Sequence, residues 1–216
     1  STRHPDAELE PNERTKMKST MPLIAAISLL AASLPATAEV IHYPLDTSHS
    51  QVGFEVRHIL STVPGRFDSF EGSVSVDPEN VEKTLKISGT VDMASVNTNN
   101  GKRDDHLRSA DFFDVENHGK MTFESNKVQK KGDKYLVTGD LTMRGVTKSV
   151  DWEVVIHGFA DNPFTKTPMT ALDMKGVIDR QDFGVSFSKT LETGSLLVSD
   201  DVTMLVHIEA TVPPGN

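Results

Sequence analysis

The chain has 216 residues, of which 37% are hydrophobic and 25% are charged, and its formal net charge is -9. This composition is typical of a globular domain that is long enough to bury its own core. No run of Lys and Arg exceeds two residues, so the acidic chain lacks the basic surface needed by nucleic acid or anionic membranes. The absence of cysteine excludes disulfides, thiolate metal sites and cysteine nucleophiles.

The N-terminal part has the features of a secretory signal peptide. Met17-Lys18 begins a short basic region, residues 22–34 are an uncharged apolar run, and Ala36-Thr37-Ala38 is a small-x-small cleavage site. The apolar run has 13 residues, fewer than the roughly 20 that a membrane-spanning helix needs, so we expect no stable membrane span. We therefore expect cleavage after Ala38 and a periplasmic protein.

This interpretation divides the chain into three parts. Residues 1–16 are expected to be an upstream extension, residues 17–38 the signal peptide, and residues 39–216 a single β-barrel domain. No internal repeat, low-complexity segment or linker indicates a second domain in the mature chain.

Most of the chain after residue 40 alternates apolar and polar residues, which is the period of a strand with one buried face. The segments with this pattern are 51–58, 70–76, 85–93, 121–125, 135–143, 150–156, 172–178 and 202–211. Turn signals separate them, including residues 63–66, and a longer loop is expected over 159–168. About eight strands at short spacing predict an all-β sandwich or an antiparallel barrel.

Four glycines favour the barrel over the sandwich. Gly72, Gly89, Gly139 and Gly176 each fall in the middle of the apolar face of a different predicted strand. Their missing side chains either leave space for a ligand inside or allow a strongly bent sheet to coil. The residues around them are Phe, Leu, Ile, Val and Met, so any cavity would be apolar and its ligand long and apolar.

The stretch Asn97–Val115 does not alternate and contains the best helix candidate of the mature chain. It concentrates charge in Arg103, Asp104, Asp105, His106 and Arg108. We favour a structural role for these residues, with Asn99 or Asn100 as the N-cap and Asp104 paired with Arg108 at i, i+4.

Two chemical interpretations of the polar residues remain open. An envelope hydrolase could use His106 with Asp104 or Asp105 as acid and base, and Ser50 or Ser109 as nucleophile, although no GxSxG motif supports it. A metal site could gather His42, His49, His58 and His106, but no pair has helical ligand spacing, and we predict no metal. His58 is in phase with an apolar face and is expected to be a core histidine.

A series of motifs in this chain resembles the YceI family of bacterial envelope proteins. The similar segments run from Tyr43 to Ala210, with matching order and spacing. They are Asp46-x-x-His49-Ser50-x-Val52-x-Phe54-x-Val56-x-His58, Gly65-x-Phe67-x-x-Phe70-x-Gly72, Ser95-x-x-Thr98, Arg103-Asp104-x-His106-Leu107-Arg108-Ser109-x-Asp111-Phe112-Phe113-Asp114, Gly139-x-Leu141-Thr142-x-Arg144-Gly145-Val146-Thr147-Lys148 and Arg180-x-Asp182-Phe183-Gly184-Val185.

The resemblance implies an antiparallel lipocalin-like barrel of eight or slightly more strands, with one or two short helices in the 99–115 connection. It implies a buried hydrophobic tunnel that binds a long isoprenoid-type lipid, such as a polyprenyl chain or an isoprenoid quinone, for storage or transport. The resemblance also implies that the protein could form a homodimer, as members of the family frequently do. It implies neither a catalytic site nor a cofactor. A stress-related or structural module with a filled barrel is the remaining alternative.

The predicted ligand contacts are the apolar residues that the alternation directs inward. They are Phe54, Val56, Phe70, Val74, Ile87, Val91, Phe112, Phe113, Leu141, Trp152, Met174, Ile178, Phe183 and Met204. Within Asn97–Val115, we expect Leu107, Phe112 and Phe113 to face inward and to close one end of the cavity, while the polar residues fix the connection to the rim.

Overall fold

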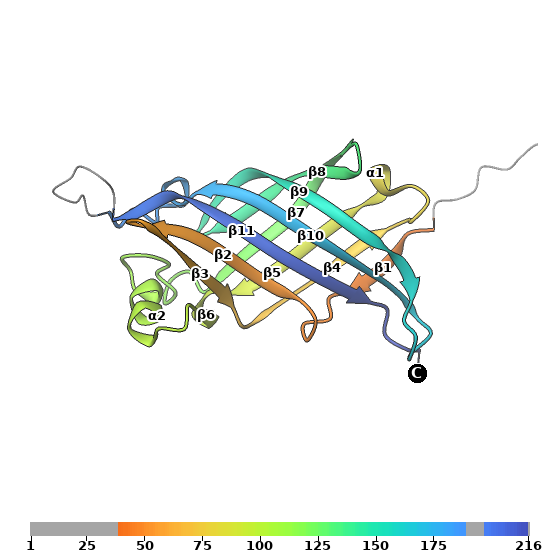
Figure 1. Ribbon diagram of the computed structural model, residues 1–216, viewed down its shortest axis with the longest axis horizontal. Coiled ribbons are helices and arrows are strands. Elements are labelled where there is room, and N and C mark those ends of the chain that lie inside the picture. The colour runs from red at the N-terminus through yellow and green to blue at the C-terminus, as the bar shows by residue number, and fades with distance from the viewer. Residues whose placement is uncertain (1–38, 189–196, 216) are drawn as a thin grey trace, which may run out of the picture. The chain divides into compact units, whose positions relative to one another are not determined.

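The computed structural model describes residues 39–188 and 197–215, and in these residues one antiparallel sheet of eleven strands curls around an apolar interior (Figure 1). The predicted upstream extension and signal peptide lie outside the described residues. In the described part of the chain, no helix has the length and apolar character needed to cross a membrane.

Each strand is antiparallel to its neighbours, and their order in the sheet is β1-β4-β5-β7-β8-β9-β10-β11-β2-β3-β6. The strands are β1 (Ile41–Pro44), β2 (Gln51–His58), β3 (Ser61–Phe67), β4 (Phe70–Val76), β5 (Lys86–Asp92), β6 (Val96–Asn97), β7 (Lys120–Lys131), β8 (Lys134–Met143), β9 (Val146–Asp161), β10 (Pro168–Asp179) and β11 (Val198–Thr211). The helical elements are α1 (Val81–Thr84), α2 (Gly101–Arg108) and the 3-10 turns η1 (Met93–Ser95) and η2 (Arg180–Phe183).

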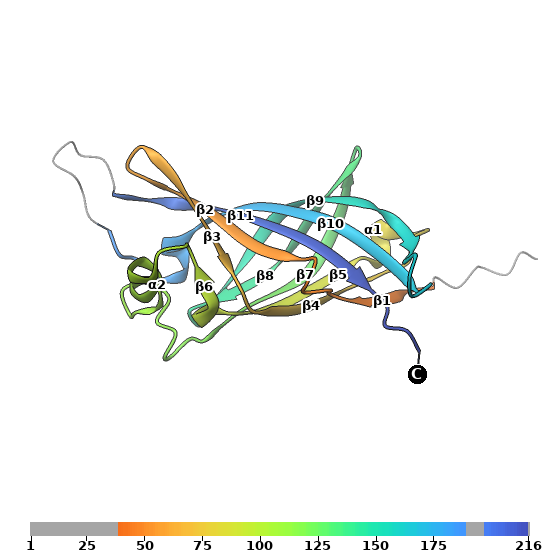
Figure 2. The same cartoon turned by 60° about the horizontal axis from the view of Figure 1, so that its bottom comes forward.

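The sheet folds back on itself where the chain leaves β1. Leu45 forms an isolated bridge with Ala210 of β11, and the Asp46 N–H donates to the Glu209 carbonyl at 2.8 Å. These contacts join an edge strand to the middle of the sheet, and the turned view shows the strands surrounding one interior (Figure 2). The structure therefore confirms an antiparallel barrel rather than two packed sheets, with eleven strands instead of about eight.

Side chains from the apolar face of every long strand fill this interior. Val137 and Val154 are fully buried, and Leu141 and Trp152 retain 2% and 3% of their accessible surface. Burying a side chain of this size contributes about 1.5–3 kcal/mol. The apolar residues of the alternating pattern thus stabilise the fold by their burial, and they are also the residues that face the interior.

Two of the inward glycines provide room for aromatic rings of neighbouring strands. A Cβ atom at Gly139 would lie 2.5 Å from the Phe123 ring, and one at Gly176 would lie 3.1 Å from the Trp152 ring. Phe123 and Trp152 themselves make an edge contact with ring centroids 5.5 Å apart. At these positions the missing side chain is replaced by a ring, which supports close packing of a curved sheet rather than open space.

Two of the expected connections are wrong. Residues 63–66 lie inside β3 and not in a turn, and Pro64 is tolerated there because the far edge of β3 pairs only through Arg66 and Phe67 with β6. The expected loop over 159–168 is shorter, because β9 continues to Asp161 and β10 begins at Pro168.

Candidate functional site

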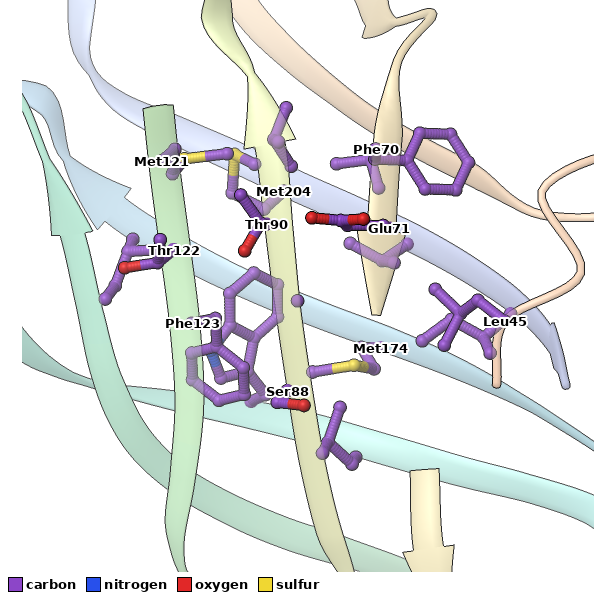
Figure 3. A pocket seen from close by; sticks show the side chains of 18 residues that line it. Leu45, Phe70, Glu71, Ser88, Thr90, Met121, Thr122, Phe123, Met174 and Met204 are labelled. Carbon is purple, nitrogen blue, oxygen red and sulfur yellow. The ribbon is translucent and has the colours of Figure 1, made fainter. Parts of the chain in front are cut away.

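The barrel encloses an apolar space that we call the inner cavity, with a volume of about 70 Å³. Strands from all around the sheet contribute to it, and Figure 3 shows their side chains converging. The lining residues are Leu45, Val52, Phe70, Glu71, Ile87, Ser88, Gly89, Thr90, Val91, Met121, Thr122, Phe123, Leu141, Trp152, Met174, Met204, Val206 and Ile208.

A second apolar space, the middle cavity, has a volume of about 80 Å³. It lies towards α2, and its lining residues are Phe54, Val56, Phe67, Leu107, Phe112, Phe113, Met121, Met143, Ile178, Arg180, Val185, Val198, Val202 and Met204. Arg180 is the charged exception, and it is 4% exposed. Its guanidinium donates to the Ser199 carbonyl at 3.0 Å and to the Asp200 carboxylate at 2.8 Å, so its charge is compensated within the protein.

Met121 of β7 and Met204 of β11 line both cavities and separate them. Both side chains are buried, and methionine has flexible, unbranched torsions that adapt to the shape of a neighbour. Rotation of these two side chains would join the inner and middle cavities into one apolar tunnel. We call this position the junction between the two cavities.

The middle cavity continues into a wider space, the vestibule, with a volume of about 350 Å³. The two share Phe54, Val56, Leu107, Phe112 and Val198. The residues that line only the vestibule are His58, Val63, Thr98, Arg103, His106, Phe187 and Leu197. His58 is half-buried here, so the expectation that it is a core histidine is wrong.

The helix α2 is held beside the vestibule by its own polar residues. The Asn100 side chain accepts from the Arg103 N–H at 3.1 Å and caps the helix, as expected. The buried Asp104 carboxylate accepts from the Thr98 N–H at 2.9 Å and from the Thr98 hydroxyl at 2.5 Å. Arg108 pairs with Asp105 at 2.7 Å, so the predicted pairing of Arg108 with Asp104 is wrong.

The segment after α2 turns two phenylalanines into the barrel. The Phe113 N–H donates to the Leu107 carbonyl at 3.0 Å, and Phe113 packs against Phe67 with ring centroids 6.1 Å apart. Phe112 packs against Phe187 at 4.9 Å. Leu107, Phe112 and Phe113 all line the middle cavity, which is the position that the sequence predicts for them.

Twelve of the fourteen predicted ligand contacts line the inner or the middle cavity. The exceptions are Val74 and Phe183, which are each 1% exposed but line neither cavity. Val74 pairs with Tyr43 of β1, a strand that the sequence pattern did not predict, and Phe183 lies in η2 beyond the end of β10.

The sequence prediction missed several lining residues, above all Met121 and Met143. Alternation within residues 121–125 could have included Met121, but its place at the junction depends on which strands face each other across the barrel.

The sequence predicts that Trp152 faces inward, but it does not predict the hydrogen bonding of the indole N–H. Its Nε1 is buried with no hydrogen-bond partner in the described part of the chain. An unpaired buried donor costs about 1–3 kcal/mol, so an acceptor on a bound molecule would be favoured there.

The groups required for the hydrolase alternative do not come together. His106 Nε2 lies 3.0 Å from Asp111, while Asp104 is bound to Thr98 and Asp105 to Arg108. The Ser109 hydroxyl donates to the His106 carbonyl at 2.7 Å, and not to its imidazole. The neighbouring side chains therefore brace α2 and its connection, which is the role that the sequence analysis favoured, rather than forming the acid–base group of the hydrolase alternative.

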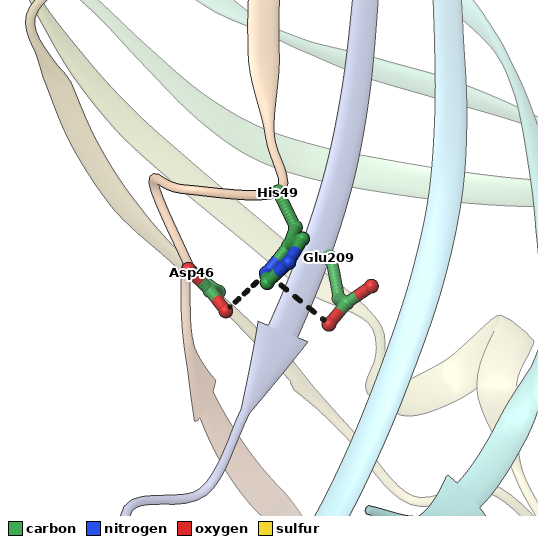
Figure 4. Close-up of side chains that lie close together, drawn as sticks. All are labelled: Asp46, His49 and Glu209. Atoms are coloured by element: carbon green, nitrogen blue, oxygen red, sulfur yellow. Dashed lines mark hydrogen bonds and ion pairs between the residues drawn. The ribbon is translucent and has the colours of Figure 1, made fainter.

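One histidine lies in a group that could hold a metal ion. Asp46, His49 and Glu209 place one ligand atom each within 4.8 Å of one another, and this is the one such group found among the described residues (Figure 4). His49 Nδ1 lies 2.8 Å from Asp46 Oδ2 and 3.9 Å from Glu209 Oε1. The other Asp46 oxygen accepts from the Ser48 N–H and hydroxyl.

Hydrogen bonds explain the titration of this group. The Ser48 hydroxyl and then His49 lower the pKa of Asp46 to about 2. The hydrogen bond to Asp46, followed by the charges of Asp46 and Glu209, raises the pKa of His49. The group fixes the connection from β1 to β2 against β11, outside the two apolar cavities.

A curled antiparallel sheet around an enclosed apolar interior defines the class of β-barrel proteins that can hold an apolar ligand. The family model of the YceI-like domain matches residues 43–210. The chain therefore belongs to the YceI family, as the sequence motifs predict.

Relatives and solved structures agree with this family over most of the chain. A UPF0312 protein of Staphylococcus aureus is 34% identical over 172 residues, covering 79% of this chain and 98% of the relative. Burkholderia cenocepacia BcnA is 27% identical, with a TM-score of 0.67 over 77% of this chain and 99% of BcnA. The YCEI protein of Campylobacter jejuni is 32% identical, with a TM-score of 0.63 over 78% of this chain and 96% of that protein.

A more distant likeness concerns the fold. A polyisoprenoid binding domain from Saccharophagus degradans is 19% identical, with a TM-score of 0.57 over 79% of this chain and 98% of that domain. This likeness shows that the two chains share a fold over most of their length.

Proposed function

We propose that this protein binds a long isoprenoid-type lipid, such as a polyprenyl chain or an isoprenoid quinone, and stores or transports it in the bacterial envelope. The observation that carries the proposal is the apolar interior, in which two cavities meet at Met121 and Met204. An extended hydrocarbon chain could run through both cavities, because they share these two lining residues. The similar fold of the polyisoprenoid binding domain from Saccharophagus degradans supports the same ligand class.

Burial alone provides enough free energy for such binding. Each methylene group moved from water into an apolar site contributes about 0.8 kcal/mol. Ordering a flexible chain and displacing the methionines opposes part of this gain. A chain that occupies both cavities therefore binds more tightly than one that occupies a single cavity.

The direct test is to purify the exported protein from a bacterial membrane background and to analyse it by native mass spectrometry and solvent extraction. We expect a bound apolar lipid whose mass identifies its chain length and head group. The same spectra report whether the protein is a homodimer, which remains part of the proposal. Repeated preparations that carry no lipid and take up no added polyprenol would contradict the function and favour a filled structural barrel.

The envelope location rests on the sequence of residues 17–38, and it has its own test. N-terminal sequencing of the periplasmic fraction should give Glu39 as the first residue, after cleavage following Ala38. Protein that remains in the cytoplasm with Met17 at its N-terminus would contradict export without affecting lipid binding.

A further inference from the structure

The lining of the vestibule combines two histidines and an arginine. Its polar lining consists of His58, Thr98, Arg103 and His106. No Asp or Glu belongs to this lining among the described residues, although the whole chain has a net charge of -9. The mouth of the apolar interior therefore presents cationic and hydrogen-bond-donating groups in an otherwise acidic protein.

Two hydrogen bonds hold the Arg103 side chain in place and leave its other N–H donors unused among the described residues. Its Nε donates to the Thr98 hydroxyl at 2.7 Å, and its Nη2 donates to the Thr98 carbonyl at 2.8 Å. Thr98 is itself fixed by the buried Asp104 carboxylate. A guanidinium has five N–H donors, and the remaining ones have no acceptor within the described part of the chain.

Two histidines complete this side of the vestibule. His106 contacts the Phe112 ring at 4.9 Å and the Phe187 ring at 5.0 Å, both edge-on, and its Nε2 faces Asp111 at 3.0 Å. His58 is the last residue of β2, and its side chain makes no hydrogen bond within the described residues. The carboxylates of Asp104 and Asp111 thus orient neighbouring groups without lining the space.

We propose that the vestibule binds the anionic head group of an amphiphilic lipid, a carboxylate or a phosphate, with Arg103 as its main partner. This inference rests on the proposed function, and it adds the orientation of the ligand: the head group lies beside α2, and the chain extends through the middle cavity towards the inner cavity. Arginine suits this role because its planar fork can donate two parallel hydrogen bonds to one oxyanion. The vestibule is also wider than either apolar cavity, as a head group requires.

The test compares geranylgeranoic acid with geranylgeraniol, which have the same prenyl chain and differ only in the head group. Wild-type protein should bind the acid more tightly, and Arg103→Gln should weaken acid binding about tenfold or more while leaving the alcohol within about twofold. Lys102→Gln is the matched control, because Lys102 is the exposed neighbour on α2 and lies outside the vestibule. It should change neither affinity.

Each other outcome has a defined meaning. Equal affinities of wild-type protein for both probes would overturn the head-group assignment, whereas failure of both probes to bind would overturn the lipid-binding function itself. Equal weakening of both probes by Arg103→Gln would assign Arg103 a purely structural role. If Arg103→Gln and Lys102→Gln weakened acid binding equally, long-range charge would explain the effect of Arg103, and no specific contact would be needed.

Two further arms keep the test decisive. Arg103→Lys keeps the charge but loses the planar fork, so it should retain the preference for the acid in reduced form, and it replaces Arg103→Gln if that variant fails to fold. Calorimetry with inorganic phosphate alone separates a lipid head group from a free anion. We expect no saturable binding; phosphate binding that depends on Arg103 would overturn the lipid assignment.

Discussion

Phe112 and Phe113 connect the polar helix α2 to the apolar interior, although the two rings pack in different directions. Phe113 lies against Phe67 of β3, and Phe112 lies against Phe187. Asp105, on the same helix, has an exposed side chain whose partner is Arg108. The aromatic pair therefore forms part of the wall of the middle cavity, while Asp105 stabilises only the helix surface.

Substitution should separate these roles. Phe112→Ala or Phe113→Ala should accelerate loss of bound lipid, because each removes a wall of the middle cavity, and truncating a buried phenylalanine also costs about 3–5 kcal/mol of stability. Asp105→Ala should change lipid retention little, because an exposed ion pair contributes about 0–1 kcal/mol. Retention is measured as the dissociation rate of a fluorescent prenyl probe, below the melting temperature of every variant. Faster release from Asp105→Ala than from Phe113→Ala would refute this assignment.

The shifted pKa values of Asp46 and His49 predict how the stability of the fold depends on pH. The pKa of His49 is raised, so its charged form is stabilised by folding; this contribution is complete below the ordinary value of about 6.5 and is lost as pH rises through the folded pKa. On the acidic side, the contribution of Asp46 is present above its ordinary value and is lost as pH falls through about 2.

An NMR titration of the imidazole checks the histidine. The midpoint of His49 should lie above that of an unperturbed histidine and should move down in Asp46→Asn, because the main partner of the charged ring is then neutral. An unchanged midpoint in that variant would show that Asp46 does not set the pKa.

At the scale of single elements, α2 shows which polar interactions a sequence reveals. An Asn before a helix is a strong local signal, and Asn100 does cap α2. The partner of Arg108 could not be chosen in the same way, because Asp104 and Asp105 are both close in sequence. The choice depends on Thr98, which lies outside the helix and binds Asp104.

The cap has a measurable contribution to stability. Asn100→Ala should lower the free energy of unfolding by about 1 kcal/mol, because the Arg103 N–H loses its acceptor. Denaturant unfolding measures this, with the exposed Lys102→Ala on the same helix as the control. A change below that of the control would mean that solvent satisfies the N-terminus of α2 equally well.

Strand alternation explains why most of the barrel was predictable. It identifies the buried face of β4, β5, β8, β10 and β11 residue by residue, and with it most of the cavity lining. It fails for short elements such as β1 and β6, with four and two residues, because so few positions carry no periodic signal. It also fails for β3, where Pro64 and Gly65 read as a turn; Gly65 is required there because a Cβ would lie 2.2 Å from the Phe54 ring.

At the scale of the whole molecule, the junction between the two cavities brings together residues that no local sequence pattern places side by side. Met121 and Met204 come from β7 and β11, which are not neighbours in the sheet, and they meet only because the sheet curls. The sequence predicts an apolar interior, but it does not predict where that interior narrows.

Blocking the junction should therefore select for chain length. Met121→Trp should reduce the affinity for an octaprenyl chain about tenfold or more and affect farnesol much less, because the short chain can occupy the vestibule and the middle cavity without passing the junction. Overpacking costs about 1–3 kcal/mol, so melting temperatures are compared, and Met169→Trp outside the two cavities serves as the control. Equal losses for both chains would indicate that the junction is not on the path of the ligand.

The most direct test of the central claim observes the ligand inside the barrel. Protein labelled with 13C at its methionine methyl groups is mixed with a polyprenyl lipid, and nuclear Overhauser contacts to the prenyl methyl groups are recorded. The tunnel predicts contacts to Met174 in the inner cavity and to Met121 and Met204 at the junction, and none to Met169, which lines neither cavity. Bound lipid that contacts Met169 but none of the three interior methionines would contradict the account.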